Sequence, residues 1–468
     1  MPDRYRWQPI ADFEGDPRAL TDGELESLLR VWKSQKSEFV EGNALDEFDK
    51  RLRREWAIET GIIEGVYTLD RGVTRTLIEK GIDAALIPHD STNRDSTLVA
   101  RIVQDHYDVL EGLLDFVGGQ RQLSTSYIKE LHAALLRNQE TYTAVDRFNN
   151  LFEKRLEKGQ YKTEPNNPTR PDGSIHEYCP PEHVASEMDR LVAMHAEHET
   201  RGVPPEVESA WLHHRFAQIH PFADGNGRVA RALASLVFIR AEWFPVVVRR
   251  DERARYIEAL EKADAGDLRP LVVMFVEAQR NALIQATEVA CEIKPPTTAD
   301  EAIAAVRDRL MQRGRLTPKQ WLNAKETAGQ LVGFAQQRFS QLIGHLTEEI
   351  GTPGFVFSVA SGPREAEGAV QKAGLVADLT EFNWSSRLSL NTGRGEMLQL
   401  SFYAVGPRFR GIIGVVPHLS MQGTEPVLVD VGTFLINYEE DLASAQQRFS
   451  VWLEKVIVAG LNQWRLSL

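Results

Sequence analysis

The residues best suited to chemistry lie in one short stretch, His-Pro-Phe-Ala-Asp-Gly-Asn-Gly-Arg-Val-Ala-Arg, which runs from His220 to Arg231. The imidazole of His220 has an ordinary pKa that suits it to take a proton from a nucleophile near neutral pH. Asp224 carries a carboxylate of the kind that holds Mg²⁺ against phosphate oxygens. Arg228 and Arg231 carry guanidinium groups, which bind phosphate through paired hydrogen bonds. The stretch therefore predicts a polyphosphate site with a base beside it.

The backbone of the same stretch is suited to hold an anion. Gly225 and Gly227, on either side of Asn226, allow a turn that a Cβ atom would obstruct, and the N–H groups of such a turn can converge on an anion. Apolar residues recur with helical spacing before and after the stretch, so we expect a helix, a tight loop and a second helix whose positive end faces the loop. Each feature is common by itself, but together in this order they predict a phosphate-binding loop.

The stretch resembles the signature of the Fic family, His-x-Phe-x-(Asp/Glu)-Gly-Asn-Gly-Arg-x-x-Arg, and agrees with it at every specified position. Most proteins of that family transfer AMP from ATP to a hydroxyl side chain of a target protein. The resemblance implies that His220 is the general base and that Asp224 is the Mg²⁺ ligand. It also implies a set of ATP-binding residues, of which the last contacts the γ-phosphate: Gly225, Asn226, Gly227, Arg228 and Arg231. The related Doc-type phosphotransferases have Lys in place of Gly227, so the glycine favours AMP transfer.

A second motif lies upstream, at Thr60-Gly61-Ile62-Ile63-Glu64-Gly65. Taken alone, it indicates a helix that ends at a glycine, with Glu64 exposed. It also resembles the (Ser/Thr)-x-x-x-Glu-(Gly/Asn) motif of the Fic subgroup that carries an N-terminal inhibitory helix. A carboxylate paired with Arg231 would occupy the arginine that should orient the γ-phosphate, and the α-phosphorus would then be misaligned for in-line attack. We therefore expect Glu64 to inhibit the activity.

Other elements are expected to complete the site. The segment 159–178 is rich in Pro, Asn and Gly, which predicts either a β-hairpin or an ordinary surface loop. In the Fic family a β-hairpin flap lies here and pairs with the backbone of the target protein. The helix that begins at Arg253 resembles one that contacts the nucleotide base, which implicates Tyr256 and Asp264, although the family's usual Asn is here Asp264. His132 lies on the apolar face of a predicted helix, which favours a structural role.

The sequence predicts a mainly α protein with a Fic-type helical core and a β-hairpin flap, followed by a smaller α+β domain. The resemblance does not cover that last domain, which has the usual size of an independent domain. The predicted segments are an N-terminal helical region with the inhibitory motif, the Fic catalytic domain, a Pro-rich linker and the α+β domain: 1–118, 119–290, 291–300 and 301–468.

Composition narrows the class of function. The chain has 468 residues and a net charge of −13, which argues against broad nucleic-acid binding. No apolar run has membrane-spanning length, and the first residues lack the apolar core of a signal peptide. Two cysteines, Cys179 and Cys291, are too few for a disulfide scaffold. We therefore expect a cytoplasmic protein that binds ATP and Mg²⁺ and acts without membrane attachment.

Three functions are open at this point. The first is AMP transfer, inhibited by Glu64, to a Ser, Thr or Tyr hydroxyl of a target protein docked on the flap 159–178, or of the chain itself. The second is removal of AMP from modified proteins, with Glu64 positioning water. The third is a non-enzymatic module that binds a nucleotide, and the presence of His220 and Asp224 argues against it because binding alone would need neither.

Overall fold

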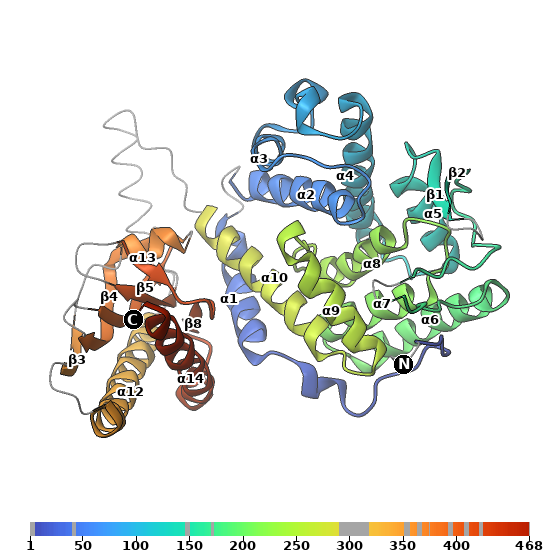
Figure 1. Ribbon diagram of the computed structural model, residues 1–468. Helices are drawn as coiled ribbons and strands as arrows, with labels where there is room; N and C mark the ends of the chain where they lie inside the picture. Colours follow the sequence, from blue (N-terminus) through green and yellow to red (C-terminus); the bar gives the residue numbers. More distant parts are fainter. Residues whose placement is uncertain are drawn as a thin grey trace. The chain divides into compact units, whose positions relative to one another are not determined.

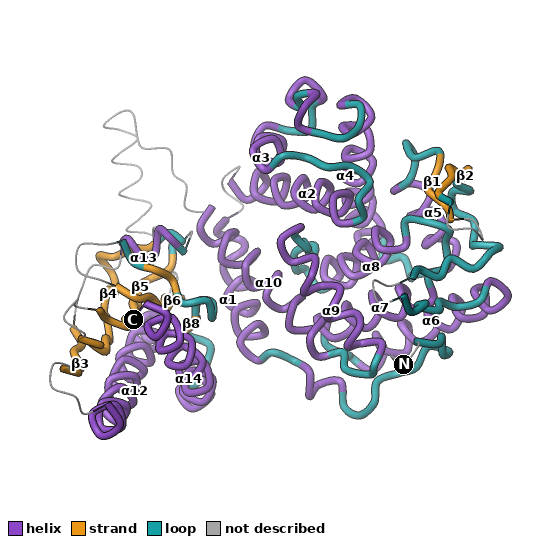
Figure 2. Tube along the Cα trace, viewed as in Figure 1, coloured by secondary structure: helices purple, strands orange, loops and turns teal. Residues whose placement is uncertain are grey.

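The structure is a computed structural model that describes residues 5–467 except for the following segments: 40–43, 146–149, 170–172, 290–317, 351–355, 363–366, 374, 392–395, 407–410 and 421–424. Helices dominate the described chain (Figures 1 and 2). The chain divides into two compact units, Met1–Asp22 with Asp46–Ala282, and Gly23–Leu45 with Leu283–Leu468. The segment boundaries predicted after residues 118, 290 and 300 stay predictions. None of the described helices is both long enough and apolar enough to cross a membrane.

The first unit is built from α-helices joined by short 3-10 turns. Its helices are α2 (Ala44–Ile63), α3 (Arg71–Lys80), α4 (Ser96–Gly118), α5 (Thr125–Leu135), α6 (Pro181–Arg201), α7 (Pro205–Ile219), α8 (Asn226–Arg240), α9 (Arg253–Asp264) and the start of α10 (Arg269–Val289). The 3-10 turns are η1 (Pro17–Leu20), η2 (Ala84–Leu86), η3 (His89–Ser91) and η4 (Arg250–Glu252). Both α6 and α7 begin with proline, which suits the first helical turn because its N–H group is not needed there.

Helix α8 is the centre of this unit. It contacts α4, α5 and α7, and nearly all of its side chains are buried, from Asn226 to Ile239. A helix that is buried all round is positioned by packing on every side. The loop that precedes α8 is therefore attached to a helix that packing holds on every side.

The β-hairpin of the first unit consists of β1 (Thr141–Val145) and β2 (Leu151–Arg155), paired antiparallel. The sequence-based placement of a hairpin at 159–178 is wrong, because the described part of that segment forms only one isolated bridge, between Thr169 and Ile175. Prolines within the segment lack the N–H groups that a ladder needs. The run Thr-Tyr-Thr-Ala-Val of β1 is rich in β-prone residues, and this signal could have located the hairpin.

The second unit combines helices with one antiparallel sheet, as the predicted α+β class requires. Its elements are α1 (Gly23–Phe39), α12 (Pro318–Ile350), β3 (Val356–Gly362), α13 (Glu367–Lys372), β4 (Ala377–Asn391), β5 (Glu396–Val405), β6 (Ile412–Ser420), β7 (Val427–Leu428), β8 (Phe434–Asn437) and α14 (Leu442–Ser467). The sheet has six strands in the order β3-β4-β5-β6-β7, and β8 also pairs with β6. Helices α12 and α14 pack on the sheet and on each other (Figure 1). Phe449 of α14 contacts Phe402 and Phe434.

Two details of this unit go beyond the sequence analysis. The sequence analysis names no strand over the range of β4. Apolar residues alternate only weakly with the Ser, Asn and Arg residues of this strand. Helix α1, at the N-terminal end of the chain, belongs to this unit: Glu24 pairs with Arg448 at 2.8 Å, and Asn437 donates a hydrogen bond to the Ser27 hydroxyl at 2.7 Å. These buried polar contacts join segments that are far apart in sequence.

Candidate functional site

The loop between α7 and α8 carries the predicted signature. His220 caps the C-terminus of α7 in the left-handed region, with φ of 53°, and Gly225 has φ of 80° immediately before α8. A histidine rarely adopts this conformation, whereas glycine adopts it without strain. Phe222 is fully buried between these two turns and anchors the loop to the core. The predicted order of helix, loop and helix is therefore present.

The side chain of Asn226 closes this loop. Its Oδ1 accepts a hydrogen bond from the Phe222 N–H at 2.9 Å, and its Nδ2 donates to the Phe222 carbonyl at 2.7 Å. The side chain is buried, and both of its polar atoms are hydrogen-bonded to the backbone of the loop. Its own backbone N–H lies in the first turn of α8, where helix N–H groups lack intrahelical partners. Any contact of Asn226 with phosphate would therefore come from this N–H.

His132 of α5 holds the loop from the other side. Its Nδ1 accepts a hydrogen bond from the Gly159 N–H at 2.8 Å, and its Nε2 donates to the Asp224 carbonyl at 3.0 Å. Its ring stacks on Phe222 with centroids 3.8 Å apart. Only the neutral ring with its proton on Nε2 satisfies both partners, and burial lowers its pKa to about 4. The predicted structural role agrees with these contacts.

The imidazole of His220 has two close contacts. Its Nδ1 donates to the Ala217 carbonyl at 3.2 Å, which leaves Nε2 as the proton acceptor. The ring of Tyr178 stacks on it almost in parallel, with centroids 3.7 Å apart. Burial, and after it the charge of Lys162, lowers the pKa of His220 to about 3. The ring is therefore neutral near pH 7, as a general base must be before it takes a proton.

Asp224 lies at the edge of the loop. Its Oδ2 accepts hydrogen bonds from Gln139 Nε2 at 2.6 Å and from Arg228 Nη2 at 3.3 Å, and about a third of its side chain is exposed. The described residues contain no group of three or more His, Cys, Asp or Glu side chains that could hold a metal ion. A single carboxylate still fits Mg²⁺, which keeps several waters and binds through one or two carboxylates together with substrate phosphates.

Arg228 is buried with part of its guanidinium group unused. Only 1% of the residue is exposed, and within the described part of the chain its Nε and Nη1 have no hydrogen-bond partner. A buried donor without a partner costs free energy, and more so when it is charged. The free donors lie on the first turn of α8, so they are suited to an anion at the start of this helix.

Arg231 is fully engaged by the upstream motif. Its Nε donates to Thr60 Oγ1 at 2.8 Å, its Nη2 to the Thr60 carbonyl at 3.0 Å, and its Nη1 to Glu64 Oε1 at 2.9 Å. The first and fifth residues of the upstream motif thus bind the same guanidinium group. Arg231 is 1% exposed, and the Glu64 side chain is 25% exposed. Glu64 is therefore the more exposed partner of a mostly buried ion pair.

Gly227 allows the approach of Glu64 to α8. A Cβ atom added at Gly227 would lie 2.7 Å from Glu64 Cδ, which is closer than real Cβ atoms come to another heavy atom. The carboxylate of Glu64 therefore lies against the backbone at the first turn of α8. This is where the sequence analysis predicts phosphate, so the carboxylate and a phosphate would compete for one place.

The two residues predicted to contact the base lie on α9. Tyr256 is buried, and its hydroxyl is hydrogen-bonded to His213 Nε2 at 2.7 Å. Asp264 Oδ1 accepts a hydrogen bond from His214 Nε2 at 3.1 Å, and its other oxygen is 3.9 Å from His176 Nδ1. Both residues are held by histidines, and their predicted contact with a nucleotide base stays a prediction.

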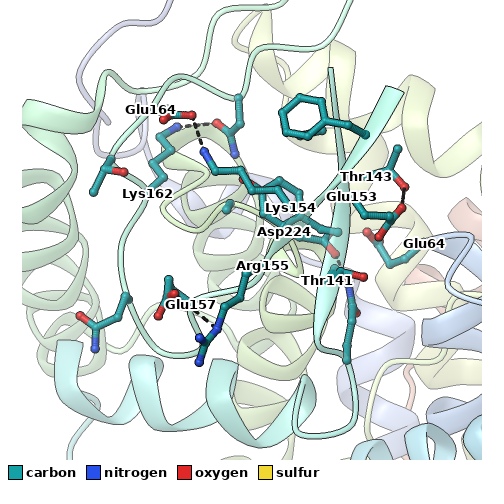
Figure 3. Close-up of a pocket in the computed structure, with 18 of the residues that line it drawn as sticks. Glu64, Thr141, Thr143, Glu153, Lys154, Arg155, Glu157, Lys162, Glu164 and Asp224 are labelled. Carbon is teal, nitrogen blue, oxygen red and sulfur yellow. Dashed lines mark hydrogen bonds and ion pairs between the residues drawn. The ribbon is translucent and has the colours of Figure 1, made fainter. Parts of the chain in front are cut away.

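A pocket of about 800 Å³ opens beside the loop. Figure 3 shows Asp224 and Glu64 in its wall together with the hairpin residues Thr141 and Lys154. This volume lies within the usual range for small-molecule sites. Sequence reasoning missed the contribution of Gln139 and of the hairpin to this wall, since neither belongs to a motif.

Residues 160–168 form another wall of the pocket and are attached to the signature loop. The Lys162 N–H donates to the Pro221 carbonyl at 2.8 Å, and Asn166 Nδ2 donates to the Phe222 carbonyl at 2.8 Å. Burial lowers the pKa of the Lys162 ammonium to about 8. These polar groups bind the signature loop and do not form a strand ladder, which is why the described part of the segment 159–178 contains no hairpin strands.

Comparisons with known proteins agree with the signature. Residues 122–238 match the family model described as the Fic/DOC family. Protein adenylyltransferase fic-1 of Caenorhabditis briggsae is 28% identical over 250 residues, which are 50% of this chain and 42% of the relative. Protein adenylyltransferase Fic of Nematostella vectensis is 33% identical over 117 residues, 25% of this chain and 26% of the relative. The chain thus spans less than half the length of these relatives.

Among solved structures, a Fic domain containing signaling protein from Bacteroides thetaiotaomicron has a TM-score of 0.47 and 24% sequence identity, and the match covers 57% of this chain and 97% of that chain. The family model covers α5, the hairpin β1–β2, α6, α7, the whole signature loop and most of α8. Residues 122–238 of the chain therefore form a region that matches the Fic/DOC family.

Proposed function

We propose that the chain is a protein adenylyltransferase, which transfers AMP from ATP to a hydroxyl side chain of a target protein. The observation that carries the proposal is the buried Arg228, whose free donors belong to the first turn of α8, directly after the short loop that carries a neutral His220. A phosphate-binding guanidinium next to a proton acceptor is suited to phosphoryl or nucleotidyl transfer. The names of the relatives, protein adenylyltransferases, favour nucleotidyl transfer.

The triphosphate of ATP would bind at the start of α8. Arg228 offers two buried donors, the first turn of α8 offers backbone N–H groups, and Arg231 offers a further guanidinium once Glu64 has left. Asp224 would hold Mg²⁺, which supplies charge neutralisation of the phosphate oxygens when it is bound. Tyr256 and Asp264 are proposed to contact the base of the nucleotide.

His220 would act on the target hydroxyl. Its Nε2 takes the hydroxyl proton, the oxygen forms a bond to the α-phosphorus, and the bond from that phosphorus to the β-phosphate oxygen breaks, so that pyrophosphate leaves. The hydrogen bond from Nδ1 to the Ala217 carbonyl supports this role, because it sets the tautomer in which Nε2 accepts.

Glu64 is proposed to inhibit this reaction. Its carboxylate pairs with Arg231 and lies against Gly227 at the start of α8. A γ-phosphate would carry negative charge to the same place, so its binding and the presence of Glu64 exclude each other. Transfer would then require Glu64 to move away, which makes the pair a regulatory contact.

The target protein is proposed to dock over the pocket, on the segment 159–178 and on the hairpin beside it. The strand β2 presents Leu151 and Phe152, which are 72% and 46% exposed. Exposed apolar side chains next to a reaction site favour contact with another protein surface. The chain itself is a second candidate acceptor, through any hydroxyl that reaches the pocket.

The test compares Glu64→Gly with wild type and with Glu64→Gly/His220→Ala, each incubated with Mg²⁺, ATP and a cell lysate. Mass spectrometry is expected to detect AMP-sized mass gains only with the single variant. Glu157→Ala is a matched control, because Glu157 is a carboxylate on the same pocket but is paired with Arg155. Phosphate-sized gains would indicate phosphotransfer, and release of AMP from modified proteins without any gain would indicate the reverse reaction; either result contradicts the proposal.

A further inference from the structure

A row of four aromatic rings leads from the N-terminal arm, the residues 5–16 that precede η1, to the imidazole of His220. Tyr5 stacks on His176 with centroids 4.4 Å apart and planes 9° apart. His176 meets Tyr178 edge to face at 4.7 Å, and Tyr178 stacks on His220 at 3.7 Å and 9°. The four residues come from three separate segments of the chain, so the row is a product of the tertiary structure.

We propose that Tyr178 is a positioning residue for His220 and that Tyr5 supports it through His176. The proposal rests on the proposed function, in which His220 takes the proton of the target hydroxyl. In this proposal Tyr178 does not contact the reacting atoms. Its ring is proposed to fix the plane of the imidazole and to exclude water from one of its faces.

The geometry at His220 leaves the imidazole few other restraints. The residue has a left-handed backbone at the end of α7, and among the described residues its ring makes one hydrogen bond, of 3.2 Å, to the Ala217 carbonyl. A single bond at Nδ1 allows the ring to pivot about that atom. A parallel ring at 3.7 Å blocks this pivot, because tilting the imidazole would bring the two ring faces into collision. Catalytic groups lose rate steeply when they are misplaced by about 1 Å.

Tyr5 holds both sides of this stack together. Its hydroxyl accepts a hydrogen bond from Gln218 Nε2 at 3.0 Å, and its carbonyl accepts one from the Glu177 N–H at 3.3 Å. Gln218 lies two residues before His220, and Glu177 immediately precedes Tyr178. One residue of the arm therefore links the helix that carries the base to the segment that carries its stacking partner.

The pKa of His220 depends on the surroundings of its imidazole, so measuring it tests the proposed role of Tyr178. The titratable groups that act on the imidazole are Lys162 of the pocket wall, His176, which stacks on Tyr5, and Asp224 of the loop. Burial is the largest cause of the lowered pKa of His220, ahead of Lys162. Removal of the Tyr178 ring would admit water to the imidazole, and the charged form would become less unfavourable. The pKa of His220 would then rise toward its ordinary value of about 6.5.

The experiment uses the Glu64→Gly protein as background and compares Tyr178→Leu with Tyr178→Phe. In Tyr178→Leu we expect kcat to fall about ten- to hundredfold while the KM for ATP changes less than about threefold. The acid limb of the kcat profile should move to higher pH. Tyr178→Phe keeps the ring and should stay within about twofold of the background. Thermal unfolding of each variant establishes that it is folded.

The support by Tyr5 is tested in the same way, by comparing its stack with a second aromatic stack in the N-terminal arm. Tyr5→Ala should raise the pKa of His220 and lower kcat about three- to tenfold, because the support of Tyr178 is weakened. Trp7→Ala removes a similar stack in the same arm, between Trp7 and His183 at 5.7 Å, and should change neither quantity. If Tyr5→Ala and Trp7→Ala behave alike, the arm has only a general structural role and the support by Tyr5 is refuted.

A failure of the proposed function can be distinguished from a failure of the positioning role of Tyr178. The pKa of the His220 imidazole can be followed by NMR titration, with His220→Ala used to assign the signal, and this measurement needs no transfer activity. A raised pKa in Tyr178→Leu, together with no transfer by Glu64→Gly, would retain the positioning contact but refute the reaction. Transfer by Glu64→Gly with an unchanged pKa and kcat in Tyr178→Leu would refute the role of Tyr178 alone.

Discussion

Glu64 and Arg231 are 167 positions apart in sequence, yet Nη1 of the arginine donates a hydrogen bond of 2.9 Å to the carboxylate. Thr60, one helical turn before Glu64, binds the other two nitrogens of the same guanidinium group. The pair is mostly buried, and such charge-assisted hydrogen bonds are about twice as strong as neutral ones. Under the proposed inhibition, this arginine would become available to a phosphate only after the carboxylate is displaced.

The charge of Glu64 should account for part of its inhibition. We expect Glu64→Gln to raise the rate of AMP transfer about tenfold, and Glu64→Gly to raise it further. The amide keeps the size and one acceptor but loses the charge, which weakens the pair by about 1.4 kcal/mol, a factor of ten. Initial rates of AMP incorporation measure this, with Glu157→Gln as control. A rate for Glu64→Gln equal to that of wild type would contradict the expectation.

The unused donors of Arg228 should serve the nucleotide and not stability. In the Glu64→Gly background we expect Arg228→Met to weaken ATP binding at least tenfold, because charge-assisted bonds to phosphate are lost. The free energy of unfolding should stay within about 1 kcal/mol or increase, because a buried charge with unpaired donors is removed. Calorimetric titration with ATP and urea unfolding measure the two effects. A large loss of stability with unchanged affinity would show that the side chain is structural.

His132 should make stability depend on pH. Its pKa is about 4 in the folded chain and about 6.5 when unfolded, so the unfolded state binds more protons between these values. Its contribution to stability is therefore complete above pH 6.5 and is lost as the pH falls toward 4. His132→Phe keeps the stack on Phe222 and should reduce the slope of unfolding free energy in this window by up to about 1.4 kcal/mol per pH unit. Urea unfolding at a series of pH values measures the slope, and an unchanged slope would contradict the assignment.

Both the Oδ1 acceptor and the Nδ2 donor of the Asn226 side chain should be needed for stability and for transfer. Asn226→Asp keeps an acceptor for the Phe222 N–H but places an oxygen against the Phe222 carbonyl, in place of the Nδ2 donor. We expect a loss of about 2 to 4 kcal/mol in the free energy of unfolding, together with loss of transfer. Asn167→Asp is the control, because the bond of Asn167 to the Tyr178 N–H uses only its oxygen. Equal losses in the two variants would show that the added charge, and not the missing donor, is responsible.

Some of this protein could be predicted from its sequence, because the responsible preferences are local. The signature loop needs a turn, two glycines and the start of a helix within twelve consecutive residues, His220 to Arg231, and such backbone preferences act over a few neighbours. The helices of the first unit follow from apolar residues with helical spacing. The placement of the hairpin failed, because the Pro- and Asn-rich composition of 159–178 is shared by hairpins and by loops.

Other parts were decided only by the tertiary structure. Nothing in the local sequence pairs Tyr178 with His220, or His132 with the Asp224 carbonyl, because these contacts depend on how separate helices and segments pack. The contact of Glu64 with Arg231 could be expected only through a resemblance to known motifs, since ion pairs leave no periodic pattern in a sequence. Local preferences determined which residues could do chemistry, and packing of the buried α8 and its neighbours decided which of them meet.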